Sequence, residues 1–492
     1  MGFPLTGVTL SLAIFLVGSA EATLESNPQD CISIADFDED TDYFPAKFVP
    51  HNTTDLFEIS YRKTYKVITN KFQNKSYLLY MCGTPPPADE IASGKHHLVL
   101  PVPHKGGIAI TQTPQIAPPE MLGKRREITA YIGNPKYVSS PCLDYMADVE
   151  KSLQIIYFPE DPSNSTLIDA ATAEYMQENP DAIIFAGPTG DRAERDRHMA
   201  FAASQERTAV ATFDWIGVYS ALFNLEGFAN KIVAETEERY DCSARNAAAL
   251  TADLPEEEKK TVLWAQWFDL SWLDVNIDHG WSVASCPTWD SAFNCEFAHH
   301  CGADIISRPE GLGTSYTWGS DTLYWYLTDE EFLEVGKDAD VWIYPSKTYL
   351  DVYAKKKELM DQFKAVQDEE VYDTQGKGEH AWHEQRLAEY DVVALDMCAL
   401  VGNGNPNPPI HRRRWFRNVY AEAVGFLSEC NAPSEIDEPY VPAEAECSPL
   451  VEDLPSLLGD PADTSASIVP SGSMPVVFVS FVVGGFFAAT WF

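Results

Sequence analysis

The chain has 492 residues, of which 35 are basic and 74 are acidic, so its formal net charge at pH 7 is −39. Phosphate contacts need clustered lysine and arginine, and this charge therefore argues against a nucleic-acid-binding role. The length is enough for two lobes of ordinary domain size. The 12 tryptophans and 22 tyrosines can supply a core and line a binding cleft besides.

The N-terminus indicates export. Residues 1–22 form an apolar run that ends in the small-residue pattern Ala20-Glu21-Ala22, which is typical of a cleaved signal peptide. Residues 23–59 are acidic and interrupted by Pro and Asn, so we expect a surface extension there. Export makes three glycosylation sequons usable, and they lie at Asn52, Asn74 and Asn164.

The C-terminus predicts a membrane attachment. An acidic and polar linker is expected over residues 431–475, followed by a wholly uncharged tail over 476–492. The tail has no basic flank, which disfavours a standard membrane helix. Small residues upstream, with Ser465 as the candidate attachment residue, fit a glycolipid (GPI) signal. A short terminal membrane helix is the alternative. Either one places the protein on the extracellular face of the plasma membrane.

Ten cysteines in an exported chain suggest disulfides, whose connectivity the sequence does not fix. Cys286, Cys295 and Cys301 are close enough in sequence for one local bridge. Zinc binding by this cluster, with the neighbouring His299 and His300, is the weaker alternative because no paired CxxC spacing is present.

The elements in chain order predict α/β structure. Alternating apolar and charged residues indicate strands in the first lobe, placed over 60–212: 59–83, 96–103, 107–113, 126–133, 153–159 and 181–190. Helices are expected over 116–124 and 166–180. Alternation of strand and helix implies a largely parallel sheet, whose ligands bind beyond the carboxyl ends of the strands.

A long helix follows the first lobe. Apolar residues at helical spacing over 216–240 predict about 24 helical residues, and we assign 213–242 as a linking helix. The second lobe, over 258–430, resumes the alternation. Its expected strands are 261–268, 280–286, 339–346 and 391–401, and its expected helices are 328–337 and 348–367.

Four groups of stretches resemble a known family: YLLYMCGTPPP with GIAITQTPQIAPPEMLG, REITAYIGNPKYVSSPCL, WIGVYSALFNLEGFANKI, and TVLWAQWF with WSVASCP and ADVWIYPS. The chain resembles the class III periplasmic binding proteins, which bind siderophores and cobalamin, and in particular their diatom-type ferrichrome-binding relatives. The resemblance implies two Rossmann-like lobes joined by a single long helix, with a ligand cleft between the lobes.

A ferric hydroxamate siderophore already satisfies the coordination of its iron, so its binder needs aromatic faces and a few hydrogen-bond donors rather than metal ligands or a cofactor. Strand ends facing the cleft supply the candidates. In the first lobe they are Thr111, Gln112, Thr113, Gln115 and Tyr137. Helix capping by Thr111 or Thr113 is an equally good interpretation of that turn.

The second lobe contributes aromatic candidates, which are Trp267, Trp272, Trp281, Tyr316, Trp318 and Tyr344. Each one alone is more often a core residue than a ligand contact. Arg413, in the run of Arg412 to Arg414, is a candidate for gripping a ligand oxygen. Pairing with surface acids is the alternative.

Enzymatic motifs are lacking: the sequence has no GxSxG, HExxH, GxxxxGK[ST] or strand-linked GxGxxG. His380 and His383 are spaced to share a helix face, but no third metal ligand is evident, and a solvated helix or loop is the default. The favoured function is capture of a ferric siderophore at the cell surface for iron uptake, with an unknown uptake or reductase partner. The alternatives are binding of another chelate such as haem or cobalamin, a tethered reductase or hydrolase, or a structural wall protein.

Overall fold

A computed structural model describes residues 26–161, 164–188, 192–269, 279–307, 309, 311–317, 323–428, 430, 433–442 and 446–450. The expected signal peptide, the hydrophobic tail, Ser465, Trp272 and Trp318 lie outside these residues. Within them, no helix has the length and apolar character needed to cross a membrane.

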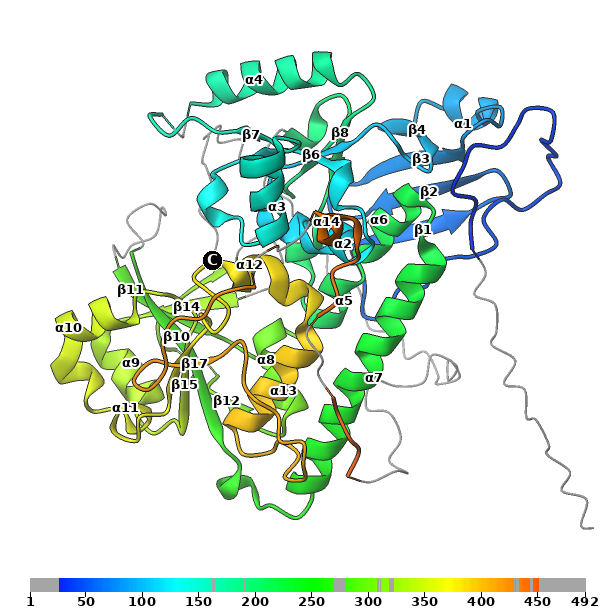
Figure 1. Cartoon of the computed structure of the whole chain (residues 1–492). Helices are drawn as coiled ribbons and strands as arrows, with labels where there is room; N and C mark the ends of the chain where they lie inside the picture. Colours follow the sequence, from blue (N-terminus) through cyan, green and yellow to red (C-terminus); the bar gives the residue numbers. More distant parts are fainter. Residues whose placement is uncertain are drawn as a thin grey trace, which may run out of the picture.

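The first lobe begins with a four-stranded sheet in the order β1-β2-β3-β4. Its strands are β1 (Phe57–Tyr61), β2 (Tyr65–Asn70), β3 (Lys75–Met81) and β4 (Leu98–Val102). The strand β2 is antiparallel to both β1 and β3, whereas β4 runs parallel to β3, with α1 (Ala88–Ala92) in the crossover between them (Figure 1). Tyr77, Leu78 and Leu79 at the centre of β3 are all buried, so both faces of this strand are covered.

A second sheet of five parallel strands completes the first lobe, in the order β7-β6-β5-β8-β9. Its strands are β5 (Ile108–Ile110), β6 (Ile128–Ile132), β7 (Gln154–Ile156), β8 (Ile183–Ala186) and β9 (His198–Ala200). The helices between them are α2 (Ala117–Met121), α3 (Pro141–Tyr145) and α4 (Ser165–Glu178). The βα units expected from the sequence are confirmed.

The linking segment is not one helix. After α5 (Ala209–Phe213), the helix α6 (Ile216–Phe223) ends at Asn224, and α7 (Glu226–Thr251) starts two residues later. Asn224 has a φ of 58°, in the left-handed region that asparagine tolerates better than most residues. The predicted uninterrupted helix over 213–242 is therefore wrong at its centre and nine residues short at its end. The helix α7 runs from the first sheet down to the second lobe (Figure 1).

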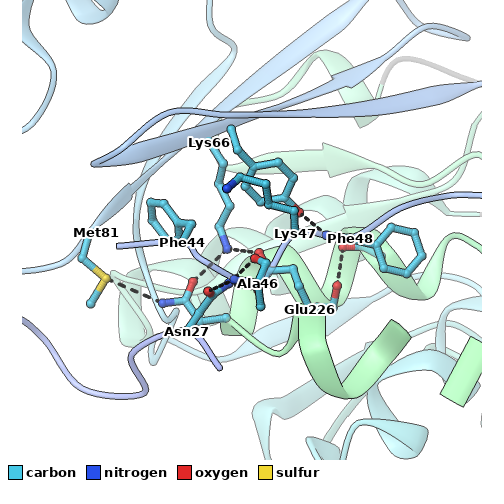
Figure 2. A network of polar contacts seen from close by, with 12 residues as sticks. Asn27, Phe44, Ala46, Lys47, Phe48, Lys66, Met81 and Glu226 are labelled. Atoms are coloured by element: carbon cyan, nitrogen blue, oxygen red, sulfur yellow. Dashed lines mark hydrogen bonds and ion pairs between the residues drawn. The ribbon is translucent and has the colours of Figure 1, made fainter. Parts of the chain in front are cut away.

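A buried polar network stabilises the chain at this break, and Figure 2 shows the network. Nζ of Lys66, from β2, forms an ion pair with Glu226 at the start of α7, and both side chains have no exposed surface. Nζ also donates to Oδ1 of Asn224 at 2.8 Å and lies 4.6 Å from the centre of the Phe44 ring. Asn27 donates to Oε2 of Glu226 at 2.7 Å. The N-terminal extension, the first sheet and α7 are thus joined at one point.

The second lobe is a mixed sheet in the order β13-β14-β11-β10-β15-β16-β17, with β12 beside β10. Its strands are β10 (Thr261–Asp269), β11 (His279–Ala284), β12 (Asp304–Ile305), β13 (Thr314–Thr317), β14 (Leu323–Leu327), β15 (Val341–Tyr344), β16 (Val371–Asp373) and β17 (Arg417–Asn418). Strands β10, β12, β15 and β16 are parallel, whereas β11, β13, β14 and β17 are antiparallel to their neighbours. The prediction of two α/β lobes is confirmed.

The helices of the second lobe are α8 (Phe293–His300), α9 (Asp329–Gly336), α10 (Tyr349–Met360), α11 (Lys364–Gln367), α12 (Ala381–Glu384) and α13 (Tyr390–Leu400). The expected strand over 391–401 is wrong, because this segment is α13. Its apolar run is buried on nearly all sides, and periodicity does not distinguish such a helix from a buried strand.

The expected linker after residue 430 is partly wrong. The helix α14 (Ser434–Asp437) packs against the first lobe, where Nη1 of Arg125 donates to the carbonyl oxygens of Glu435 at 2.5 Å and Glu438 at 2.8 Å. The amide of Tyr440 donates to the carbonyl of Glu120 at 2.8 Å. The chain thus returns to the first lobe after completing the second.

Five disulfides link all ten cysteines: Cys31–Cys82, Cys142–Cys430, Cys242–Cys447, Cys286–Cys295 and Cys301–Cys398. The expected local bridge is the fourth pair, and the disulfides leave no cysteine free for zinc. Among the sequons, Asn52 and Asn74 are exposed, whereas the side chain of Asn164 caps α4.

Candidate functional site

The turn after β5 is shaped by glutamines. Oε1 of Gln115 accepts hydrogen bonds from the amides of Thr111 at 2.8 Å and Gln112 at 3.2 Å. Gln112 and Gln115 form a capping box around the short helix Thr113–Gln115. The cap expected from Thr111 or Thr113 is therefore made by glutamine side chains. Thr111 instead donates to the carbonyl of Phe185 in β8 at 3.0 Å.

Loops from the two lobes meet beside this turn. Tyr137, in the loop after β6, packs edge-to-face against His380, just before α12, with ring centroids 5.1 Å apart. The amide of Ser139 donates to Oε2 of Glu384 at 2.7 Å. Tyr137 keeps 36% of its surface exposed. It is thus a candidate from the sequence that the structure brings to the boundary between the lobes, with His380 and Glu384 as its neighbours from the second lobe.

Two buried carboxyl groups face each other across this boundary. Oε1 of Glu120, in α2, accepts from Nε of Arg125 at 2.8 Å and from Oγ of Ser140 at 2.5 Å. Burial raises the pKa of Glu384 well above its ordinary value, and the negative charge of Glu120 raises it further. Burial also raises the pKa of Glu120, although Arg125 opposes this. A protonated Glu384 can remain uncharged and donate a hydrogen bond.

Several buried polar atoms at this boundary have no hydrogen-bond partner among the described residues. They are Nε2 of Gln115, Oε2 of Glu120, Oγ of Ser139, Nε2 of His380, Oε1 of Glu384 and Oε1 of Gln385. Buried polar atoms are normally paired, with protein or with water. Their accumulation between the lobes marks a place where a polar ligand, or ordered water, would be stabilised.

The interface is closed on its apolar side. A cavity of about 10 Å³ lies between α2, the α5–α6 segment and the short helix Gln385–Ala388. It is lined by Ala117, Pro118, Met121, Phe201, Thr212, Phe213, Ile216, Leu387 and Ala388. This volume holds about one water molecule. A larger ligand does not fit in this cavity.

Two second-lobe candidates are core residues. The ring of Trp281 is fully buried and stacks on Phe332 at 4.1 Å, and its Nε1 donates to Oδ1 of Asp329 at 2.8 Å. Tyr344 is also fully buried, and its hydroxyl is 3.0 Å from that of Thr348. Both faces of this sheet are covered, so residues near strand ends can point into a core. Trp281 and Tyr344 are thus corrected from cleft residues to core residues.

The remaining binding candidates of the second lobe lie in different environments. Arg413 lies 4.7 Å over the ring of Tyr372 and forms an ion pair with Glu422 at 2.8 Å. Its guanidinium is therefore used within its own lobe, as the surface-pairing alternative expected. Trp267 is half-buried, with Nζ of Lys356 5.9 Å from its ring centre. Trp272, Trp318 and the side chain of Tyr316 lie outside the described residues.

The sequence did not identify Glu120, Ser139 or Glu384 as site residues. Acidic residues are so numerous in this chain that none of them attracts attention by type alone. The motif GEHAWHEQ contained a usable signal, because Trp382 lies between the polar residues and indicates a buried segment. Trp382 and Glu384 are buried and His383 is half-buried, so the expected solvated helix is wrong.

The described residues contain one close group of three possible metal-binding side chains, formed by Cys142, Cys430 and Glu435. The disulfide between the two cysteines uses both sulfur atoms. This group is therefore a crosslink and not a metal centre.

Comparison with known proteins gives distant matches, and no family model matches the chain. An uncharacterised lipoprotein of Methanocaldococcus jannaschii is 23% identical over 272 residues, which cover 52% of this chain and 56% of the relative. The chain thus spans little more than half the length of this curated relative.

Solved structures with partial likeness are bacterial binding proteins. The periplasmic heme-binding protein HutB of Vibrio cholerae gives a TM-score of 0.40 at 13% identity, covering 60% of this chain and 99% of the other. The vitamin B12-binding protein BtuF of the same species gives 0.37 at 11% identity, with coverages of 60% and 96%. Nickel-bound CeuE of Helicobacter pylori gives 0.40 at 12% identity, with coverages of 61% and 84%.

Proposed function

We propose that this chain is an exported substrate-binding protein that captures a metal chelate between its two lobes, with a ferric hydroxamate siderophore as the favoured ligand, for iron uptake. The observation that carries the proposal is the contact of strand-end loops from both lobes, where Tyr137 meets His380. The resemblance of the sequence to class III periplasmic binding proteins supports the same location. Haem and cobalamin are the alternative ligands.

The chemistry of the boundary suits an oxygen-rich organic shell. A chelate needs aromatic surface, which Tyr137 offers, and hydrogen-bonding groups for its outward oxygens. Nε2 of Gln115 is an amide donor that is buried without a partner among the described residues. A protonated Glu384 adds a hydroxyl donor that carries no charge to repel a carboxylate or hydroxamate oxygen. Binding would thus pair atoms that are otherwise left unsatisfied.

A thermal-shift screen of the full chain tests the proposal, with a ferric hydroxamate, a ferric catecholate, haem and cobalamin as ligands. A ligand at 100 times its Kd stabilises the folded state by about 2.7 kcal/mol. We expect a rise of the unfolding midpoint with the ferric hydroxamate. The absence of a shift with all four ligands at saturating concentration contradicts the proposal.

A pair of tyrosine variants locates the site. Tyr137→Ala should weaken chelate binding at least tenfold. Tyr420→Ala is the matched control, because Tyr420 has the same exposed fraction of 36% but lies on the second lobe against Tyr349. Equal effects of the two variants on affinity would place the ligand elsewhere.

The cell-surface location is part of the same proposal. Its supports are the signal-like residues 1–22, the sequons at Asn52, Asn74 and Asn164, and the uncharged tail behind Ser465. Treatment of intact cells with phosphatidylinositol-specific phospholipase C should release a glycolipid-linked chain. Retention after this treatment, with release by detergent only, would favour the membrane helix.

A further inference from the structure

A pocket of about 290 Å³ opens on the outer face of the first sheet, away from the boundary between the lobes. Along β2, Lys66, Ile68 and Asn70 are buried, whereas the residues between them face outward. Glu90, Lys95 and His96, from the crossover between β3 and β4 that contains α1, form one wall of this pocket. It is lined by Ser60, Arg62, Tyr65, Val67, Thr69, Ser76, Glu90, Lys95 and His96.

Glu90 is held in this wall by three donors. Its carboxylate lies 2.7 Å from Nζ of Lys95, 3.0 Å from Nε2 of His96 and 3.1 Å from the hydroxyl of Tyr65. Hydrogen bonds from Lys95 and His96, the largest contributions, lower the pKa of Glu90 to about 2. The group is therefore a carboxylate at any physiological pH. A carboxylate only accepts hydrogen bonds.

This carboxylate determines the tautomer of His96. Because Glu90 can only accept, Nε2 of His96 must carry the proton between them, and the neutral ring then has its lone pair on Nδ1. Nδ1 lies 3.0 Å from Oγ of Ser76. The imidazole is nearly excluded from solvent, with 2% of its side chain exposed, so its orientation is fixed. Oγ of Ser76 also lies 3.2 Å from the carbonyl of Lys95, its other acceptor.

We propose that Ser76, His96 and Glu90 form a hydrolytic site for small carboxylic esters in this pocket. Such sites are recognised by geometry and roles rather than by sequence order or motif. Ser76 is the nucleophile, His96 is the general base and acid, and Glu90 is the positioning residue. The assignment is independent of chelate binding, because the pocket lies on the four-stranded sheet, whereas the loops at the lobe boundary follow strands of the five-stranded sheet.

The reaction balances with water as the only co-reactant. Nδ1 of His96 takes the proton of Ser76 as Oγ bonds to the acyl carbon, and the same proton passes to the alcohol as the ester bond breaks. Water then attacks the acyl-serine, releases the carboxylic acid and restores the serine proton through His96. Arg62 and Lys95 line the same pocket and provide positive charge for the developing oxyanion.

Labelling of the full chain with a fluorophosphonate probe tests the assignment, because this reagent traps activated serines. We expect peptide mass spectrometry to find the label on Ser76. Ser76→Ala and His96→Gln should each lower labelling, and the hydrolysis of p-nitrophenyl acetate, at least tenfold. Ser152→Ala is the matched control and should change neither rate. Its exposed hydroxyl donates to Oε2 of Glu150 at 3.1 Å rather than to a histidine, and it lies outside the pocket.

The pH dependence of labelling tests the role of Glu90 separately. With Glu90→Gln the imidazole loses its anionic partner, so the pH midpoint of labelling should move to lower pH. A purely structural role would lower the rate without moving this midpoint. The proposal is overturned if the unaltered chain is not labelled at Ser76, a result that does not depend on whether any variant folds. It is also overturned if His96→Gln is labelled at the unaltered rate.

Discussion

Lys66 and Glu226 form an ion pair from which water is fully excluded, 160 residues apart in sequence. Burial lowers the pKa of Lys66, and the charge of Glu226 opposes this shift. The pair joins Lys66, the second residue of β2, to Glu226, the first residue of α7, next to the break at Asn224 (Figure 2).

Removing one member of this pair should be strongly destabilising. Glu226→Gln leaves a buried ammonium without its counter-charge, and breaking a buried pair costs about 3–5 kcal/mol. Chemical denaturation measures this loss of unfolding free energy. The double variant Lys66→Met/Glu226→Gln should recover part of the loss. Asp40→Asn, at the exposed pair with Lys63, should leave the denaturation midpoint unchanged. Equal midpoints for Glu226→Gln and Asp40→Asn would show that the buried pair does not stabilise the junction.

Glu384 should tolerate replacement by glutamine. Burial raises the pKa of Glu384 well above its ordinary value, which favours its protonated form in the folded state. Glutamine resembles the protonated acid in shape and remains neutral. Glu384→Gln should therefore match the unaltered protein in thermal midpoint near pH 6 and exceed it near pH 9, where glutamate is driven to ionise. A lower midpoint of the variant at pH 9 would contradict a protonated Glu384. Glu379→Gln, at an exposed pair with Lys347, is the control.

Stability should fall as pH rises toward neutrality because of acids packed around the linking helices. Burial, the largest cause, raises the pKa values of Glu206, Asp214 and Glu296 each to about 7. In the unfolded chain these groups titrate near pH 4. A raised pKa of an acid means that the folded state binds more protons than the unfolded state. The contribution is therefore fully present below pH 4 and is lost between about pH 4 and pH 7.

The measurement is the thermal midpoint between pH 5 and pH 8, where a decrease of several degrees is expected. Each unit of pKa difference corresponds to about 1.4 kcal/mol. Glu206→Gln should flatten the profile, because one of the three titrating groups is then absent. A midpoint that rises over this range would contradict the assignment of protonated acids.

The disulfide between Cys142 and Cys430 should stabilise the protein more than the one between Cys286 and Cys295. The first spans 288 residues and the second spans 9. Closing a longer loop removes more entropy from the unfolded chain, and the chain-entropy model gives a difference of about 3 kcal/mol. Paired Cys→Ser variants at each bridge, compared by chemical denaturation, measure it. The reverse order would show that native-state contacts, and not loop length, dominate.

Local sequence patterns were sufficient to predict the strands and most of the helices. The parallel sheet around β5 and β8 follows from short apolar runs that alternate with helices. The turn from Thr111 to Gln115 was predicted at the end of a strand, and it directly follows β5. The segment 391–401 was predicted as a strand but forms the helix α13, because a fully buried helix and a buried strand are both uniformly apolar. The break at Asn224 was missed because it depends on contacts with Lys66 and Pro28, which are remote in sequence.

The site shows the same division. Residue type and position near a strand end selected Tyr137, which lies at the boundary between the lobes, and also Trp281, which lies in a core. Sequence periodicity describes which face of an element is apolar, but it contains no information about which second element covers that face. The sequence by itself determined the two α/β lobes and the order of their elements, because these depend on local hydrogen bonding and apolar spacing. The tertiary structure alone decided which buried charged groups interact, since contacts such as those of Glu120 with Glu384 and of Lys66 with Glu226 form only when distant segments pack.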